Sequence, residues 1–198
     1  MAGPVSVPER YGVRSVAEWA FRSSRPYANP FGDVVLDARL CGPEGQEYLV
    51  PCFYDGGGVW RMRFSPPLAG EWTMCVQACP PDPDLEWRAD FHVEAARTRG
   101  FLRATPGLGW GLTYESGEPT FILGDTTYNL FGMAHCGADV ASFMRRRASQ
   151  GVNLLRVRVP VSPFHPPEGY SRWQTRRTWP WGGSEQAPQF DRFNLEYF

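Results

Sequence analysis

The sequence predicts a chain in two parts, an antiparallel β-sandwich followed by the opening of a parallel α/β domain. Short runs of alternating apolar and polar residues recur up to residue 95, and turn-forming residues separate them. This spacing is typical of antiparallel sandwiches. Around residues 120–160, an apolar run, a helical pattern and a second β-rich run follow one another. That order indicates parallel strands joined by a helix.

The composition supports a folded chain and narrows its partners. Of the 198 residues, 42% are hydrophobic, which is enough for a core. The formal net charge of -1 and the pI near 6.3 give no attraction to nucleic acid or to an anionic membrane surface. No apolar run reaches the roughly 20 residues of a membrane span, and the first residues lack a signal-peptide pattern. We therefore expect a cytoplasmic protein without nucleic-acid or membrane partners.

The five cysteines do not form a recognisable metal or disulfide framework. None makes a Cys-x-x-Cys pair or joins a histidine at metal-ligand spacing. Cys75 and Cys79 would stand about 13 Å apart along one strand, too far for a disulfide. We expect buried free thiols, no metal and no cofactor.

Residues 13–95 are expected to form the sandwich, of the immunoglobulin-like kind, with a poorly ordered lead-in at residues 1–12. Pro51 removes a backbone donor and indicates an edge strand or a bulge. Apolar residues on one face of two strands should be largely buried, because they repeat every second position. These are Trp60, Met62, Phe64, Trp72 and Met74. The expected strands lie at 16–21, 34–40, 48–54, 60–64, 72–77 and 91–93.

Residues 96–118 are expected to be a linker with a hairpin, formed by 101–103 and 112–114, that leads into the second domain at 119–198. There, 121–123 reads as a buried strand that stops at a polar loop. A helix begins after Asp139 and ends at Gly151, and 152–159 is the next strand.

Sites in such units lie beyond the carboxyl ends of the strands, which predicts Asp125 and Arg158 at one rim. A long loop at 161–193 follows, and Asn194 is a good N-cap for a second helix. Because two parallel strands cannot close a barrel, we expect an N-terminal part of a longer protein.

Several motifs resemble a known family. Asn29-Pro30-Phe31, the run from Phe53 to Pro66 and Gly70-Glu71-Trp72-Thr73 are similar to a β-sandwich domain of unknown function that precedes the barrel in a group of predicted glycoside hydrolases. Residues 119–160 resemble the start of that (β/α)8 TIM barrel, as found in apiosidase-like hydrolases and the wider retaining clan. The resemblance covers about residues 15–198 and is more specific in the sandwich.

The resemblance implies hydrolysis of O-glycosyl bonds in a plant or microbial polysaccharide or oligosaccharide, with the sandwich packed on the barrel. Two carboxyl groups would carry the reaction, one as acid and one as nucleophile. In the clan these follow the fourth and seventh strands, so no catalytic residue is expected in this chain. Both should lie downstream of Phe198.

Two polar residues of the second domain have competing interpretations. Asp125 could bind a sugar hydroxyl or cap its own turn, and both remain open. Arg156 aligns with the clan's second-strand arginine, which implies that it orients the nucleophilic carboxylate, whereas a structural ion pair is the alternative. Strand alternation places Arg156 and Arg158 on one face.

Aromatic residues are the remaining candidates for substrate binding. Tyr128, His165, Trp173, Trp179 and Trp181 could each stack on a sugar ring, although loop packing is the commoner role for any one of them. His165 has no partner at ligand spacing. For Trp19, Trp60 and Trp72, the core is the expected place.

A different class of function is also open, that of a non-catalytic carbohydrate-binding or scaffolding sandwich. An exposed aromatic strip on the sandwich would favour this class. A buried strip, with its face turned toward residues 161–193, would favour an accessory domain that supports an enzyme.

Overall fold

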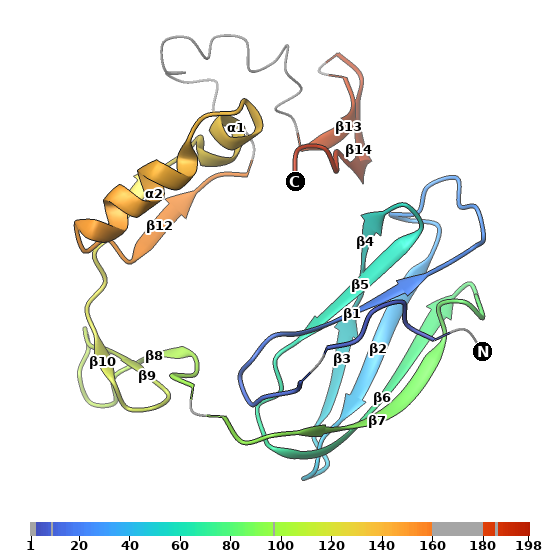
Figure 1. Cartoon of the computed structure of the whole chain (residues 1–198), viewed down its shortest axis with the longest axis horizontal. Coiled ribbons are helices and arrows are strands. Elements are labelled where there is room, and N and C mark those ends of the chain that lie inside the picture. Colours follow the sequence, from blue (N-terminus) through green and yellow to red (C-terminus); the bar gives the residue numbers. More distant parts are fainter. Residues whose placement is uncertain (1–2, 9, 97, 160–179, 185) are drawn as a thin grey trace. The chain divides into compact units, whose positions relative to one another are not determined.

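The computed structural model describes residues 3–8, 10–96, 98–159, 180–184 and 186–198. The chain divides into two compact units, Met1–Pro119 and Thr120–Phe198. The first unit is built from strands, and both helices that the structure describes belong to the second (Figure 1).

Seven strands of the first unit form two antiparallel sheets (Figure 1). The three-stranded sheet has the order β1-β5-β4, with bounds Ala17–Arg22, Val59–Phe64 and Phe53–Gly56. The four-stranded sheet has the order β3-β2-β6-β7, with bounds Glu47–Pro51, Val35–Cys41, Gly70–Cys79 and Trp87–Val93. The predicted antiparallel sheets are therefore confirmed.

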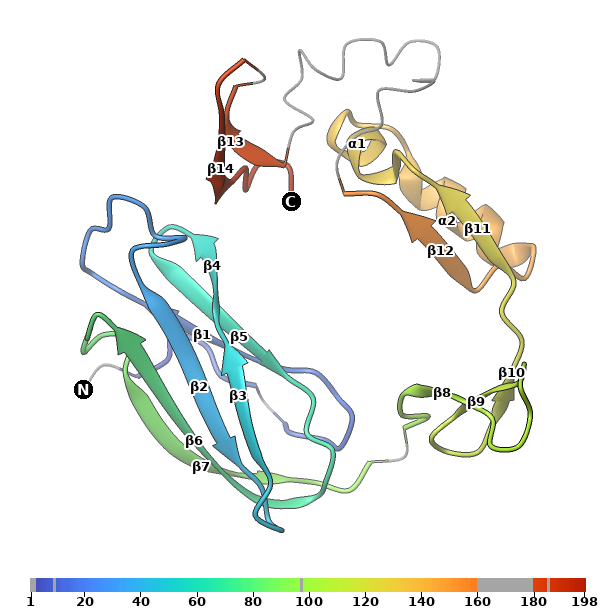
Figure 2. The same cartoon turned by 180° about the vertical axis from the view of Figure 1, so that it is seen from behind.

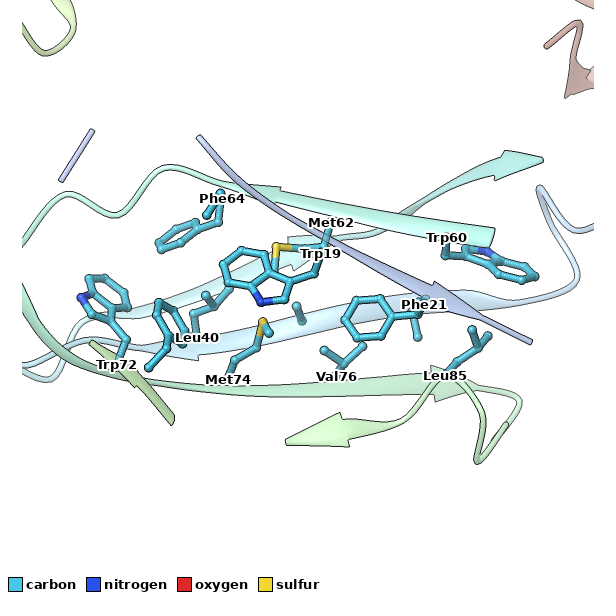
Figure 3. Close-up of a cluster of buried hydrophobic side chains, with 14 of the residues drawn as sticks. Trp19, Phe21, Leu40, Trp60, Met62, Phe64, Trp72, Met74, Val76 and Leu85 are labelled. Carbon is cyan, nitrogen blue, oxygen red and sulfur yellow. The ribbon is translucent and has the colours of Figure 1, made fainter. Parts of the chain in front are cut away.

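The two sheets share one hydrophobic core (Figure 3). All five residues predicted to be buried lie in it, none more than 9% exposed. Trp19, between the sheets, is completely buried and packs against the rings of Tyr11 and Phe91. The period-two pattern identified these positions because alternate side chains of a strand point to the same face.

The run expected as one strand at 48–54 is two strands in different sheets. β3 ends at Pro51, and β4 begins at Phe53 in the other sheet. Between them, the Cys52 amide donates to the Leu36 carbonyl at 2.8 Å. The predicted edge is confirmed, since β3 is the outer strand of its sheet. Pro51 lacks the amide that would continue the ladder, and the chain crosses to the second sheet there.

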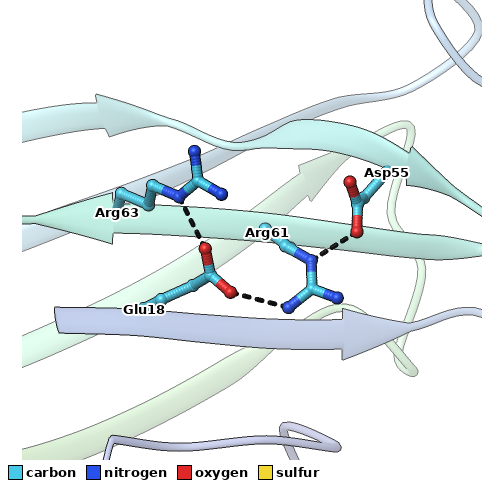
Figure 4. Close-up of polar contacts among 4 residues, drawn as sticks. All are labelled: Glu18, Asp55, Arg61 and Arg63. Carbon is cyan, nitrogen blue, oxygen red and sulfur yellow. Dashed lines mark hydrogen bonds and ion pairs between the residues drawn. The ribbon is translucent and has the colours of Figure 1, made fainter. Parts of the chain in front are cut away.

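Charged residues connect all three strands of the smaller sheet on its outer face (Figure 4). Glu18 of β1 accepts from Arg61 at 2.7 Å and from Arg63 at 2.5 Å, both on β5. Arg61 also pairs with Asp55 of β4. Such partly exposed pairs each contribute at most about 1 kcal/mol. Their effect here is to favour one register among three strands.

Two expectations for the first unit were wrong. The lead-in is not loose in its described part, because the Val5 amide donates to the Ala20 carbonyl at 2.7 Å and the Tyr11 ring packs on the core. The four cysteines of the first unit form no disulfide, but Cys79 is exposed and the other three are only half-buried. Alternation places Cys41, Cys75 and Cys79 on the outer face of their sheet, opposite the core.

A small antiparallel sheet with the order β10-β9-β8 follows the sandwich. β8 and β9 pair as predicted, and β10 adds to β9 as a third strand. The strand bounds are Leu102–Ala104, Leu112–Tyr114 and Pro119–Thr120.

The second unit begins with a strand, two helices and a parallel strand. β11 (Gly124–Thr127) pairs in parallel with β12 (Leu154–Val157), which confirms the parallel arrangement. Helix α2 (Val140–Ser149) connects them and covers one face of the pair (Figures 1 and 2). The helix begins after Asp139 and Gly151 follows it at φ +85°, both as predicted, and the Asp139 side chain caps α2 by accepting from the Ser142 amide. A short helix, α1 (Leu130–His135), was not predicted.

The first parallel strand starts later than expected. Residues 121–123 were predicted as a buried strand, yet Phe121 is 80% exposed and the ladder begins at Gly124. The Asn153 side chain explains this shift. It donates to the Phe121 carbonyl at 2.7 Å and accepts from the Leu123 amide at 3.0 Å. These side-chain bonds take the place of ladder bonds at this point.

The C-terminal part contains a hairpin where a loop was expected. β13 (Trp181–Gly183) pairs with β14 (Pro188–Phe193) in an antiparallel fashion. After it, Asn194 is buried and begins a single turn, in which the Tyr197 amide donates to the Asn194 carbonyl. The second helix expected after Asn194 stays a prediction. Within the described residues, the parallel strands number two and no closed barrel is formed. In the same part of the chain, every helix is too short or too polar to cross a membrane.

Candidate functional site

The candidate residues of the second unit are divided between the two faces of the β11–β12 pair. In the parallel register, Asp125 lies beside Leu155 and Thr126 lies beside Arg156. Because successive side chains of a strand point to opposite faces, Asp125 and Arg156 face away from each other. Helix α2 covers the face of Asp125. The opposite face carries Arg156, Arg158 and Tyr128.

Asp125 is held by the structure around it. Its carboxylate lies 2.8 Å from Arg147 Nε of α2 and accepts from the Thr126 amide, also at 2.8 Å. Asp125 is the second residue of β11 rather than part of a loop beyond it. The prediction that Asp125 and Arg158 share one rim was therefore wrong. The strand begins three residues later than expected, which moves Asp125 into the ladder and under the helix.

The face opposite α2 presents two guanidinium groups around one phenol ring. Arg156 Cζ lies 5.7 Å and Arg158 Cζ 5.8 Å from the centre of the Tyr128 ring. Both arginines are exposed, and Tyr128 is 45% exposed. The Arg158 amide donates to the Tyr128 carbonyl at 3.3 Å, which continues the ladder past the ends of both strands. Arg156 and Arg158 lie on the same face, as alternation predicts.

This arrangement can bind an oxygen-rich anion or a sugar. Each guanidinium offers several N–H donors in a plane, a geometry suited to two oxygens of one carboxylate. Stacking against Tyr128 restricts where the two forks lie and leaves their donor edges available. Among the described residues, neither arginine forms an ion pair with a carboxylate. We call the group of Tyr128, Arg156 and Arg158 the arginine face.

Trp181 is packed into its own hairpin. Its ring stacks on Phe193, with centroids 5.3 Å apart, and meets Phe190 edge-on at 5.7 Å. One face of the indole is therefore covered. These contacts favour the interpretation that Trp181 packs within its loop over the interpretation that it stacks on a sugar ring.

Tyr197 anchors the C-terminal turn near the end of β12. Its hydroxyl donates to the Val159 carbonyl at 2.5 Å, and its ring lies 5.4 Å from that of His135 on α1. Burial, with a smaller effect of the neighbouring Cys136, raises the pKa of Tyr197 to about 12. The phenol therefore stays protonated and serves as a structural donor.

Three candidates, His165, Trp173 and Trp179, lie outside the described residues. In the part of the chain that the structure describes, no three metal-ligating side chains gather in one place.

Sequence reasoning missed two residues. Arg147 neutralises Asp125, and only the helix-to-strand packing reveals this pair. Trp110 lies in the turn between β8 and β9 and is 86% exposed. Its flanking residues Gly109 and Gly111 could have suggested an exposed turn.

Comparison with known proteins gives a family match within the first unit and a fold match over nearly the whole chain. The sequence model of a family described as "Domain of unknown function (DUF5060)" matches residues 11–78. No curated protein matches the chain.

Two solved structures are similar to different extents. The crystal structure of "a putative glycoside hydrolase from Bacteroides vulgatus ATCC 8482" matches 96% of this chain with a TM-score of 0.71 and 20% identity. This chain spans 37% of the length of that protein. The filamin domain of Lin-41 matches 46% of this chain and 90% of its own, with a TM-score of 0.34 and 14% identity. The chain thus shares its fold with part of the Bacteroides vulgatus protein.

Proposed function

We propose that this chain is the N-terminal part of a glycoside hydrolase that cleaves O-glycosyl bonds in a plant or microbial polysaccharide or oligosaccharide. In this proposal, the sandwich is an accessory domain, and β11 and β12 are the first two strands of a (β/α)8 barrel. The acid and the nucleophile follow later strands, beyond Phe198. The likeness of nearly the whole chain to part of the Bacteroides vulgatus protein is the observation that carries this proposal.

The arginine face supports the same function. In a closed barrel, helices cover the outside and the opposite face of each strand points inward. Arg156 and Arg158 occupy the face opposite α2, so both would point into the barrel. From there, Arg156 could hold the nucleophilic carboxylate in place and keep it ionised. A retaining enzyme needs its two carboxyl groups about 5–5.5 Å apart, and a guanidinium fork can fix such a geometry.

The test compares the 198-residue chain with the longer protein on one panel of aryl glycosides and of plant and microbial oligosaccharides. We expect hydrolysis by the longer protein and none by the 198-residue chain. Turnover by the short chain that disappears in Asp125→Asn would contradict the proposal and make Asp125 catalytic. A longer protein that binds glycans from the panel but cleaves none would favour a binding module.

The alternative, a carbohydrate-binding or scaffolding protein, has one observation in its favour. Trp110 exposes nearly its whole ring in an ordered turn, where the Thr105 amide donates to the Gly111 carbonyl. The sandwich itself speaks against this class, since Trp19, Trp60 and Trp72 are buried. Phe53 of the sandwich is exposed, but the guanidinium group of Arg63 lies over its ring and occupies the face on which a sugar would stack. Glycan binding by the 198-residue chain that Trp110→Ala abolishes would support the alternative.

A further inference from the structure

One carboxylate, that of Glu115, joins the β8–β9 hairpin to the sandwich. Its Oε1 accepts from Arg103 of β8, at 2.6 Å from Nη2 and 3.1 Å from Nε. Its Oε2 lies 3.0 Å from Nη2 of Arg14, which belongs to the segment that precedes β1. The Arg14 and Glu115 side chains are only 24% and 23% exposed. Partial shielding from solvent makes such a pair stronger than an ordinary surface pair.

Arg14 reaches Glu115 from an unfavourable backbone conformation. Its φ of +60° makes it the one described residue other than glycine with a positive φ. Two backbone hydrogen bonds hold this segment on the sandwich. The Val13 amide donates to the Glu94 carbonyl, and the Arg14 amide donates to the Pro66 carbonyl. Residues held in such conformations persist only where the surroundings enforce them, and they often mark a functional constraint. Here the conformation aims the Arg14 side chain at the hairpin.

Phe101 completes the contact from the hairpin side. Arg14 Cζ lies 4.8 Å and Arg103 Cζ 5.7 Å from the centre of its ring. The Phe101 amide donates to Glu115 Oε2 at 3.1 Å, and the Glu115 amide donates back to the Phe101 carbonyl at 3.0 Å. Gly100, at φ +70°, makes room for this arrangement, because a Cβ there would lie 2.5 Å from Glu115 Oε2. Three groups, the two guanidinium groups and the Phe101 amide, therefore converge on one carboxylate.

We propose that Glu115 is a latch that holds the β8–β9 hairpin on the sandwich, so that residues 98–119 form one rigid body with residues 10–96. The segment at 96–118 was predicted to be a linker, and the latch gives its described part a fixed place instead. The device is built from a strained arginine, a shared carboxylate and a ring that both guanidinium groups approach. Opening it requires the loss of the Arg14–Glu115 ion pair and of the contact between Arg14 and the Phe101 ring, because the Arg103–Glu115 pair lies within the hairpin.

Trypsin cleavage of the folded 198-residue chain after Arg99 and Arg103 tests the latch. Glu115→Gln removes the charge that both arginines share, and we expect cleavage at least roughly tenfold faster than in the wild type. Glu118→Gln is the matched control, because Glu118 lies on the same hairpin and pairs with Arg99. We expect its cleavage rate to stay within about twofold of the wild type.

A second variant keeps the test decisive if Glu115→Gln fails to fold. Arg14→Gly relieves the strained φ while it deletes the guanidinium, so the sandwich should keep its melting temperature while the hairpin is released. Faster cleavage in Arg14→Gly with an unchanged sandwich supports the latch. Wild-type cleavage rates in the Arg14 variant, or equal acceleration by Glu118→Gln, would overturn it.

Discussion

Two completely buried tryptophans differ in a single hydrogen bond. The Trp72 indole donates to the Leu68 carbonyl at 3.1 Å, whereas Trp19 Nε1 has no hydrogen-bond partner among the described residues. A buried donor without a partner has lost its bonds to water and gained nothing in return. The core thus contains one satisfied and one unsatisfied indole.

This difference predicts unequal costs for the same substitution. Both Trp19→Phe and Trp72→Phe remove buried volume, but only Trp72→Phe also breaks a hydrogen bond. We expect Trp72→Phe to lower the free energy of unfolding by about 1 kcal/mol more than Trp19→Phe. Urea unfolding of both variants measures the difference. An equal or larger loss for Trp19→Phe would show that cavity formation outweighs the unpaired donor.

Arg156 is the residue whose proposed role separates catalysis from stability. In the longer protein, Arg156→Lys keeps the charge but loses the planar fork that orients a carboxylate. We expect kcat to fall by roughly a hundredfold or more, KM to change less and the melting temperature to stay near that of the wild type.

The matched control for this variant is Arg88→Lys, at an exposed position of β7. We expect no kinetic effect there. If Arg156 is structural instead, Arg156→Lys should lower the melting temperature and leave the kcat of the folded enzyme unchanged.

At the scale of elements, the turn between β4 and β5 shows how local chemistry and tertiary contact combine. Gly57 and Gly58 have φ values of +57° and +74°, and Gly56 pairs with Val59 across them. A two-residue turn with two positive φ angles matches the twist of a hairpin. A Cβ at Gly57 would meet no atom within 4 Å, whereas one at Gly58 would lie 3.0 Å from the Ser23 carbonyl oxygen.

The turn therefore predicts different costs for asparagine at neighbouring positions. Asparagine tolerates the left-handed region, so we expect Gly57→Asn to cost less than about 1 kcal/mol. Gly58→Asn also crowds the Ser23 backbone, and we expect a loss of about 2 kcal/mol. Thermal melts of the two variants provide the comparison. Equal losses would mean that the backbone at Ser23 moves aside.

The elements that differ from expectation do so for identifiable reasons. The run at 121–123 has the apolar pattern of a strand, but the side chain of Asn153 binds its backbone and delays the ladder. The segment before β1 lacks a strand pattern, yet it pairs with Ala20 because β1 is the outer strand of its sheet. In both cases a residue distant in sequence decides the outcome.

At the scale of the whole molecule, several carboxylates are more acidic than usual. Burial opposes ionisation of Asp82, but hydrogen bonds from the Ser23 hydroxyl at 2.6 Å and the Tyr27 hydroxyl at 2.7 Å outweigh it and lower its pKa. The bond from Arg63 lowers the pKa of Glu18. The Phe101 amide and Arg103 lower that of Glu115. The folded state therefore favours the ionised form of each group.

These shifts predict a loss of stability in acid. A carboxylate with a lowered folded pKa stabilises the fold fully above its unfolded pKa of about 4, and this contribution disappears as pH falls through the folded pKa. We expect Asp82→Asn to be less stable than the wild type at pH 7, with a gap that narrows toward pH 2. Urea unfolding across this range measures it. Asp90→Asn, an exposed control, should follow the wild-type curve, and a constant gap for Asp82→Asn would contradict the assignment.

Features that depend on near neighbours along the chain could be predicted from the sequence. Period-two alternation identified the buried residues of β5 and β6, Asp139 and Gly151 marked the ends of helix α2, and alternation placed Arg156 and Arg158 together. The tertiary structure alone decided which sheet each strand joins, that the chain changes sheets after Pro51, and that Asp125 faces Arg147 rather than the arginine face. It also decided that Glu115 ties the hairpin to the sandwich. The physical reason is that side-chain direction within a strand or helix follows from local geometry, whereas register and partner choice depend on contacts between residues far apart in the chain.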